Sequence, residues 1–299
     1  MITLKALHDL AEQFPEALTA KCEPMRVGDD VFDSESRPAV MATVNLSRDS
    51  TYRESIATST SSAIRKARVA HAQGAHIIDI GAESTTAKAV RVSVDEQLSK
   101  LLPVVEACVA DGMHVSAETY EPAIAEACLA AGARVLNMTG AEHQEAMLDL
   151  AAKYNATVVL CYVRGANVRE ITNVELEADP LPGIIDHFRD RVAVAKAQGV
   201  DRIVIDPGMG FFYGNLVDPM TRIRHQTQVI LNTFRLRVLG LPICHALPHA
   251  FDLFEDNFRT AEGFFAVLAR LGGATLYRTH EVAQVSAVLR SMIELDAGI

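Results

Sequence analysis

The chain has 299 residues, of which 49% are hydrophobic and 22% charged, a composition that excludes wholesale disorder. Its formal net charge is −10 and no run of Lys and Arg forms a basic stripe, so we expect no nucleic-acid partner. Five scattered cysteines without a C-x-x-C pair, no apolar leader-like segment and no apolar stretch of membrane-spanning length predict a soluble cytoplasmic protein without a membrane partner.

The first 38 residues differ in pattern from the rest. Lys5, Asp9 and Glu12 lie at amphipathic spacing, which predicts a surface helix followed by an extension that packs on the bottom or side of the main domain. From residue 39 onward, short apolar runs alternate with segments of helical periodicity. The expected strands are 39–45, 75–80, 113–117, 133–137, 156–162, 202–206, 241–245 and 274–278. The expected helices include 62–71, 94–109, 142–153, 184–197, 260–271 and 282–295.

Glycines punctuate this alternation at the point where a helix ends and the next strand begins. The six glycines at such places are Gly74, Gly112, Gly132, Gly199, Gly240 and Gly273. Eight strands that alternate with helices predict a (β/α)₈ TIM barrel over residues 39–299, with residues 1–38 as a helical extension. A doubly wound open sheet is the structural alternative.

Polar side chains stand at the ends of most expected strands, and barrel active sites form at these carboxyl ends. The residues are Asn45, Asp79, Glu118, Asn137, Asp206, His245 and Arg278, with His280 two positions further on. Exposure of the strand ends to solvent would by itself explain any one of these polar residues. The selection of Asn, Asp and Glu nevertheless favours a shaped polar pocket. Asp79, Glu118, Asn137 and Asp206 suit the N–H donors of a guanidine-like heterocycle edge.

The opposite side of the expected pocket is basic. Arg278, His280 and Asn45 predict an anion site there. Arg48 and Arg53 in the loop after the first strand, and Lys88 in the loop after the second, are placed to close over it. The resulting hypothesis is a pocket with two ends. The acidic end would bind a ring whose edge carries positive charge, and the basic end would bind phosphate.

An ordered set of local strings resembles dihydropteroate synthases from about residue 39 to the last helix. The strings are MATVNLSRDS, IIDIGAEST, VSAETY, AGARVLNMTG, IDPGMGF and YRTHEV, of which the second and fifth are the most specific. The resemblance implies that Asp79, Glu118, Asn137 and Asp206 hold a pterin ring. It also implies that Asn45, Arg278 and His280 hold a diphosphate, with Mg²⁺ near Asn45.

The same resemblance implies a reaction and its participants. A dihydropterin-methyl group passes from its diphosphate to an arylamine, and pyrophosphate leaves. The residues expected to be catalytic are Asp79, Asp206, Arg278 and His280, and Thr85, Arg48 and Lys88 are added to the substrate-binding set. The small-molecule partners are then a pterin diphosphate and an arylamine, and we expect a homodimer.

Departures from the family gather at the acceptor side. The Lys that the family carries after the seventh strand falls on His249 or, one residue later in register, on Ala250. Thr86 and Ala87 replace an Arg-Pro pair, and Glu118 replaces an Asp. A different or bulkier amine, as in a modified-pterin pathway such as that of methanopterin, is one explanation. The alternatives are a folate-to-corrinoid methyltransferase and a non-catalytic pterin-binding paralogue; Arg278 and His280 favour the synthase.

A zinc site at Cys244, His245 and His249 is a weaker hypothesis. Pro248 lies between the two histidines, and no further ligand follows at a zinc-like spacing. We therefore expect these histidines to be ordinary loop residues.

Overall fold

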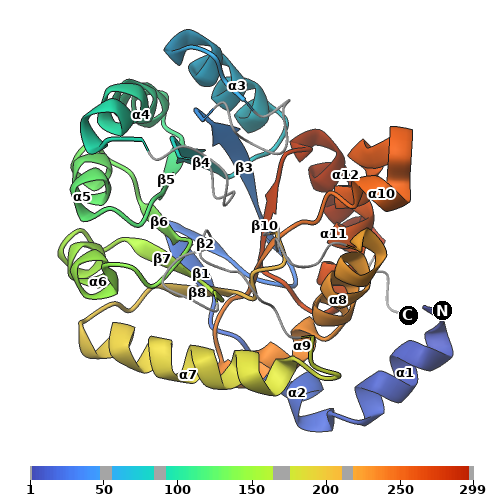
Figure 1. The fold of residues 1–299 in the computed structure, drawn as a ribbon. Helices are drawn as coiled ribbons and strands as arrows, with labels where there is room; N and C mark the ends of the chain where they lie inside the picture. Colours follow the sequence, from blue (N-terminus) through green and yellow to red (C-terminus); the bar gives the residue numbers. More distant parts are fainter. Residues whose placement is uncertain (1, 48–55, 84–91, 164–175, 211–217, 296–299) are drawn as a thin grey trace.

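A parallel barrel of eight strands, surrounded by helices, forms the body of the computed structural model, which describes residues 2–47, 56–83, 92–163, 176–210 and 218–295 (Figure 1). Its strands are β3 (Ala39–Asn45), β4 (Ile77–Gly81), β5 (His114–Glu118), β6 (Val135–Met138), β7 (Thr157–Cys161), β8 (Ile203–Asp206), β9 (Cys244–Ala246) and β10 (Leu276–Thr279). Neighbours pair in the order β8-β7-β6-β5-β4-β3-β10-β9. A parallel bridge between Ile205 and Ile243 joins the two ends of this order. The predicted TIM barrel is therefore confirmed, and the open-sheet alternative is wrong.

Helices follow the strands and pack on the outside of the barrel. The main ones are α3 (Thr60–Ala72), α4 (Val94–Ala110), α5 (Pro122–Ala130), α6 (Gln144–Lys153), α7 (Leu181–Ala197), α8 (Pro219–Leu231), α11 (Ala261–Leu271) and α12 (Val282–Glu294). Shorter turns, α9 (Thr233–Leu236) and α10 (Phe251–Phe254), flank β9. None of the helices in the described ranges has the length and apolar character required to span a bilayer.

Strand alternation divides the buried residues into two layers. Side chains such as Ile78, Ile80 and Tyr277 point outward and pack beneath the helices. Met41, Ile77, Val135, Val159 and Leu276, together with other buried residues, fill the barrel interior. Because strand side chains alternate between the two faces, the residue two positions after each interior residue also faces inward, nearer the mouth. This rule places the polar strand-end residues.

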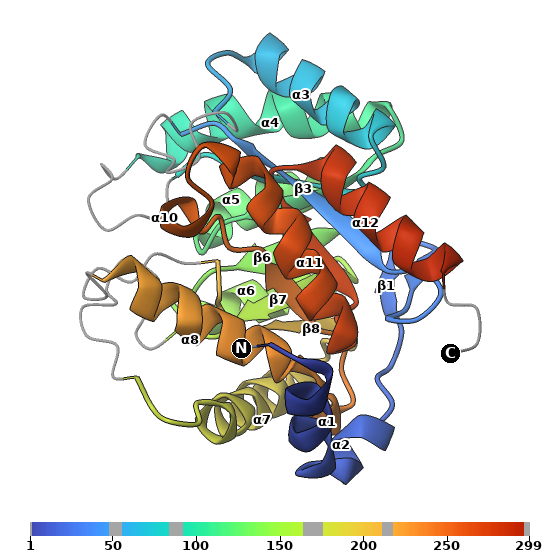
Figure 2. The same cartoon turned by 90° about the vertical axis from the view of Figure 1, so that its right-hand side faces the viewer.

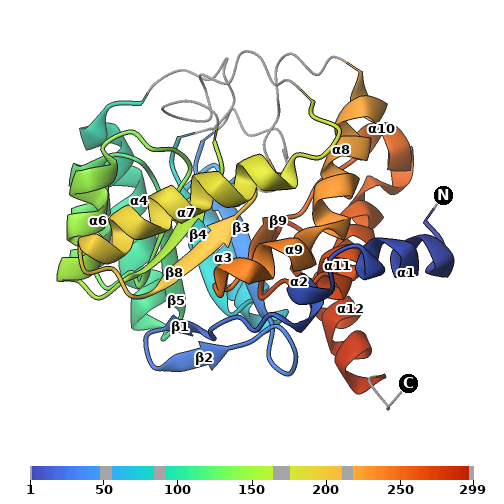
Figure 3. The same cartoon turned by 90° about the horizontal axis from the view of Figure 1, so that it is seen from below.

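The barrel floor is closed by a hairpin that the sequence analysis did not predict. β1 (Met25–Val27) and β2 (Asp30–Phe32) pair antiparallel, and Met25, Val27 and Phe32 enter the interior cluster. Figure 3 shows the hairpin across the end at which the strands begin. His114, the first residue of β5, places its Nε2 atom 2.8 Å from a carboxylate oxygen of Asp30 on β2. With its floor plugged, the barrel can present a site only at the opposite end, where the strands finish.

The segment before the hairpin lies at the side of the barrel, beneath α11 in the view of Figure 2, and its helix α2 contacts α9. It contains α1 (Leu4–Glu12), which buries no residue, and α2 (Pro15–Thr19), which buries Ala17. Phe14 lies edge-on to Phe234, and the Arg235 guanidinium lies 3.8 Å from the centroid of the Phe14 ring. The division at residue 38, with residues 1–38 as an extension packed on the barrel, stays a prediction.

Candidate functional site

Asp79, on β4, is the centre of a polar network inside the barrel mouth. Its side chain is fully buried and faces inward because Ile77, two positions earlier, belongs to the interior cluster. Ser116 donates its hydroxyl to one Asp79 oxygen at 2.6 Å, and Asn137 donates its amide to the other at 3.1 Å. The Cys161 thiol in turn donates to the Asn137 amide oxygen at 3.6 Å. Four adjacent strands thus contribute one connected set of donors and acceptors.

Arg278, on β10, crosses this network and binds two carboxylates. Its Nε donates to Asp79 and its Nη2 to Glu118, both at 2.7 Å. The predicted separation of an acidic and a basic end is therefore not found for Arg278, because its guanidinium lies between the carboxylates. Its Nη1 atom has no protein partner among the described residues, so one amino group of the fork remains for a further acceptor.

Glu118, at the end of β5, occupies space that a glycine leaves open. A Cβ atom built on Gly81 would lie only 2.9 Å from the Glu118 Oε2 atom. Burial raises the pKa of Glu118 to about 7, against the opposing attraction of Arg278 and with a further increase from the neighbouring charge of Asp79. Near neutral pH this carboxyl is therefore poised between its two protonation states.

Asp206, at the end of β8, forms a second acidic group across the barrel from β4. The backbone N–H of Gly208 donates to it at 2.7 Å, and the Cys244 side chain and the Ala246 backbone also hydrogen-bond to it. Burial raises its pKa, and the N–H of Gly208 is the leading opposing influence. A carboxylate that is buried away from solvent in this way binds strongly to a ligand with paired N–H donors.

Thr43 and Asn45 bring oxygen atoms to the same end from β3. Both lie two and four positions after Met41, an interior residue, and so face inward. The Thr43 hydroxyl is buried and has no hydrogen-bond partner among the residues that the structure describes. An unpaired buried hydroxyl costs free energy, so it indicates a place where a polar ligand completes the site.

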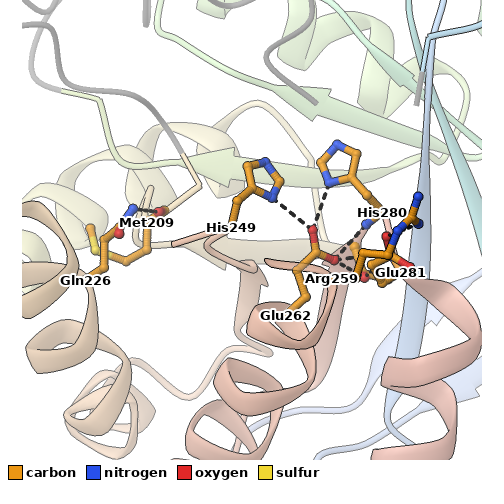
Figure 4. Close-up of polar contacts among 8 residues, drawn as sticks. Met209, Gln226, His249, Arg259, Glu262, His280 and Glu281 are labelled. Atoms are coloured by element: carbon orange, nitrogen blue, oxygen red, sulfur yellow. Dashed lines mark hydrogen bonds and ion pairs between the residues drawn. The ribbon is translucent and has the colours of Figure 1, made fainter. Parts of the chain in front are cut away.

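Two histidines near the mouth meet a carboxylate that the sequence analysis did not single out. His280 follows β10 and His249 follows β9; both direct Nδ1 to the Glu262 Oε1 atom, at 3.0 and 3.1 Å (Figure 4). Glu262 lies in the first turn of α11 and is almost completely buried. Burial lowers the pKa of His280 to about 4, against the opposing effect of Glu262. His280 is therefore a neutral imidazole near neutral pH.

Buried side chains of the surrounding helices hold the rim in place. Arg191 of α7 donates to the carbonyl oxygens of Cys161, at 2.7 Å, and Gly140, at 3.2 Å. Gln226 of α8 donates to the carbonyl of Met209 at 2.6 Å, in the segment after β8 (Figure 4). These bonds fix the backbone at the end of β7 and immediately after β6 and β8.

Most of the predicted site residues that the structure describes face the same mouth, and one strand-end prediction is wrong. His245 points outward and hydrogen-bonds to Thr233 of α9 at 2.7 Å, because strand alternation turns Cys244 inward instead. Cys244 therefore points into the barrel, His245 toward α9 and His249 toward Glu262, so these three residues form no shared metal site. The predicted loop residues Thr85, Arg48, Arg53 and Lys88 lie outside the described residues.

Sequence reasoning missed three contributors to the site. Ser116 was detectable, because it lies two positions before Glu118 on a strand and so shares its face. Thr43 stands in the same relation to Asn45. Glu262 carried no such signal, since its partners come from segments 13 and 18 residues away in the chain and meet it only through the fold.

A parallel barrel with buried carboxylates and an Asn at its mouth is the architecture of a known class of enzymes. Residues 41–280 match the family model described as pterin binding enzyme, and the chain belongs to this family.

Relatives within the family carry a more specific name. Dihydropteroate synthase of Bacillus subtilis is 29% identical over 86% of this chain and 88% of its own, and the type-2 enzyme of Escherichia coli is 33% identical over 73% and 82%. A solved structure of Xanthomonas albilineans dihydropteroate synthase with 4-aminobenzoic acid has a TM-score of 0.78 and 27% identity, covering 93% of this chain and all of the other. The predicted resemblance to dihydropteroate synthases and the transferase class of the enzyme are thereby confirmed.

Proposed function

We propose that this chain transfers a 7,8-dihydropterin-6-methyl group from its diphosphate to an arylamine and releases pyrophosphate. Membership of the pterin-binding family supports a pterin as the substrate. A second solved structure of the Xanthomonas enzyme, with 25% identity and a TM-score of 0.75, is a complex with 7,8-dihydropteroate. The observation that carries the proposal for this chain is the buried set of Asp79, Asn137 and Asp206 at the barrel mouth.

This set matches the hydrogen-bonding edge of a pterin. The edge presents an exocyclic amine and a ring N–H beside a carbonyl, so it needs paired acceptors and one mixed partner. Asp206 is a buried acceptor, and Asn137 both donates to Asp79 and accepts from Cys161. In this proposal Asp206 binds the paired N–H donors, while Asp79 orients Asn137 and stabilises positive charge on the ring as the C–O bond breaks.

Arg278 is proposed to serve both halves of the substrate. Its Nε and Nη2 atoms hold Asp79 and Glu118, which fixes the plane of the guanidinium, and its Nη1 atom is left to meet a diphosphate oxygen. His280 stands on the same strand-end segment, with Nδ1 engaged by Glu262, so it would meet the leaving group through Nε2. Thr85, Arg48 and Lys88 are proposed to complete the substrate contacts from their loops.

Mg²⁺ is proposed near Asn45. Magnesium keeps several waters and is commonly held by one or two protein oxygens together with substrate phosphates. The amide oxygen of Asn45 and the unpaired hydroxyl of Thr43, on one face of β3, fit that requirement. The ion would neutralise the leaving diphosphate. A homodimer, and an arylamine such as p-aminobenzoate or a substituted aminobenzene as in modified-pterin pathways, complete the proposal.

Calorimetric titration with 6-hydroxymethyl-7,8-dihydropterin diphosphate, with and without Mg²⁺, tests the proposed site. We expect micromolar binding that weakens without Mg²⁺. Asp206→Asn should reduce affinity roughly ten- to a hundredfold, since one charge-assisted contact is lost. Asp149→Asn is the matched control, because Asp149 is exposed on α6 and hydrogen-bonds to Gln198 far from the mouth. Absence of binding in both conditions would refute the assignment of this substrate.

A further inference from the structure

Glu262 gathers two imidazoles onto one oxygen atom. Both Nδ1 atoms, of His249 and His280, lie within 3.1 Å of Oε1, and the two rings are 4.7 Å apart between centroids (Figure 4). One ligand atom from each of the three residues lies within 4.8 Å of the other two. The residues come from the segment after β9, the first turn of α11 and the segment after β10, so the fold alone assembles them.

The other oxygen of Glu262 is held by three donors. Oε2 accepts the Thr279 hydroxyl, the backbone N–H of His280 at 2.8 Å and that of Glu281 at 3.2 Å. This leaves Oε1 as the oxygen directed at the imidazoles, in a fixed orientation. Hydrogen bonds of this kind to the non-coordinating oxygen are what position carboxylate ligands around a metal.

The charge of this cluster is not balanced by a permanent cation. Glu262 is almost completely buried, and its hydrogen bonds come from the two imidazoles, one hydroxyl and two backbone N–H groups. No Lys or Arg among the described residues bonds to it; Arg259, the nearby guanidinium in Figure 4, pairs instead with Glu281 at 2.8 Å. A buried carboxylate that faces two imidazole nitrogens offers the mixed oxygen and nitrogen ligands that a divalent transition metal binds.

Two of the three separations between these atoms match neighbouring positions of a coordination shell. Ligands about 2.1 Å from a metal and at right angles to one another are about 3.0 Å apart. The two Nδ1–Oε1 separations are 3.0 and 3.1 Å. Two imidazole nitrogens and one carboxylate oxygen form a ligand set used for divalent first-row metals, which imidazole prefers over Mg²⁺.

We infer that His249, Glu262 and His280 bind one divalent transition-metal ion, of the Zn²⁺ or Fe²⁺ class, through Nδ1, Oε1 and Nδ1. A metal bound at Nδ1 needs the lone pair of that atom, so each ligating imidazole carries its proton on Nε2. Ala250, directly after His249, has a φ of 45°, a strained value for a residue with a side chain. The site is separate from the Mg²⁺ proposed at Asn45, and it does not depend on the proposed transfer reaction.

Cobalt substitution tests this site without any pterin. The full chain is stripped with a chelator and titrated with Co²⁺, whose visible ligand-field bands report nitrogen and oxygen ligation. We expect one ion per chain, displaceable by Zn²⁺ and unaffected by excess Mg²⁺. His249→Gln changes a side chain that is 20% exposed in a loop, so this variant should fold and lose affinity by more than tenfold. Glu262→Gln should lose it as well, and circular dichroism checks the fold of each variant.

His114→Gln provides the matched control. His114 also meets a carboxylate, that of Asp30 at 2.8 Å, but as a single pair at the barrel floor, so its loss should leave Co²⁺ binding unchanged. Absence of stoichiometric Co²⁺ or Zn²⁺ uptake by the wild-type chain would overturn the inference. Equal uptake by His249→Gln and the wild type would overturn it too, by showing that the ion binds elsewhere.

Discussion

Glu118→Gln should remove a large part of the pH dependence of stability. In the folded chain the pKa of Glu118 is about 7, compared with 4.5 for the free side chain. The folded state therefore binds more protons than the unfolded state between these two values, and wild-type stability falls as the pH rises through them. The difference corresponds to about 3 kcal/mol in the free energy of unfolding. A glutamine keeps an oxygen for Arg278 and cannot titrate.

Urea unfolding followed by circular dichroism, from about pH 4.5 to about pH 8, measures this effect. The variant and the wild type should be similar in stability at the acid end, and the variant should become the more stable by roughly 3 kcal/mol at the alkaline end. Glu126→Gln is the control, since Glu126 is exposed and pairs with Lys153 on the surface. Parallel curves for Glu118→Gln and the wild type would refute the argument that burial drives this carboxyl toward its neutral form.

Three further substitutions test other parts of the structure. Gly81→Ala places a Cβ about where the Glu118 carboxylate now lies, 2.9 Å from Oε2, so we expect a loss of about 1–3 kcal/mol in urea unfolding; an unchanged midpoint would contradict this packing. Met25→Ala should lower the free energy of unfolding by about 2–5 kcal/mol, because it leaves a cavity in the fully buried floor of the barrel. Arg26→Ala, on the outward face of the same strand, should lower it by less than about 0.5 kcal/mol. Arg191→Met should weaken calorimetric binding of the pterin diphosphate, since rim carbonyls lose their donor; unchanged affinity would show that the rim needs no such support.

Much of the barrel was predictable because each strand carries its own signal. The runs 39–45 and 156–162 are apolar, β-branched and bounded by glycines or polar turns, so local pattern located them closely. β9 was harder: the predicted strand 241–245 begins with Leu and Pro, whereas the strand itself starts at Cys244. His245, expected at the mouth, faces α9 instead because the preceding residue, Cys244, points into the barrel.

The hairpin and the role of Glu262 could not be predicted from the sequence, for a different reason. β1 and β2 have three residues each, too few to show a periodicity of two, and they form because the barrel floor offers Met25 and Phe32 a place to be buried. Glu262 sits in a helix whose apolar pattern gives no hint of a site. Its importance arises from contacts with two other segments, which only the assembled fold brings together.

The most direct test of the central claim is product formation. The purified chain is incubated with 6-hydroxymethyl-7,8-dihydropterin diphosphate, Mg²⁺ and a panel of arylamines that includes p-aminobenzoate, and products are identified by mass spectrometry. The account predicts a dihydropterin–arylamine conjugate and an equal amount of pyrophosphate, both strongly reduced in Asp206→Asn and unaffected in Asp149→Asn. Binding of the diphosphate without a conjugate from any amine would contradict the account and identify the chain as a pterin-binding protein without transferase activity.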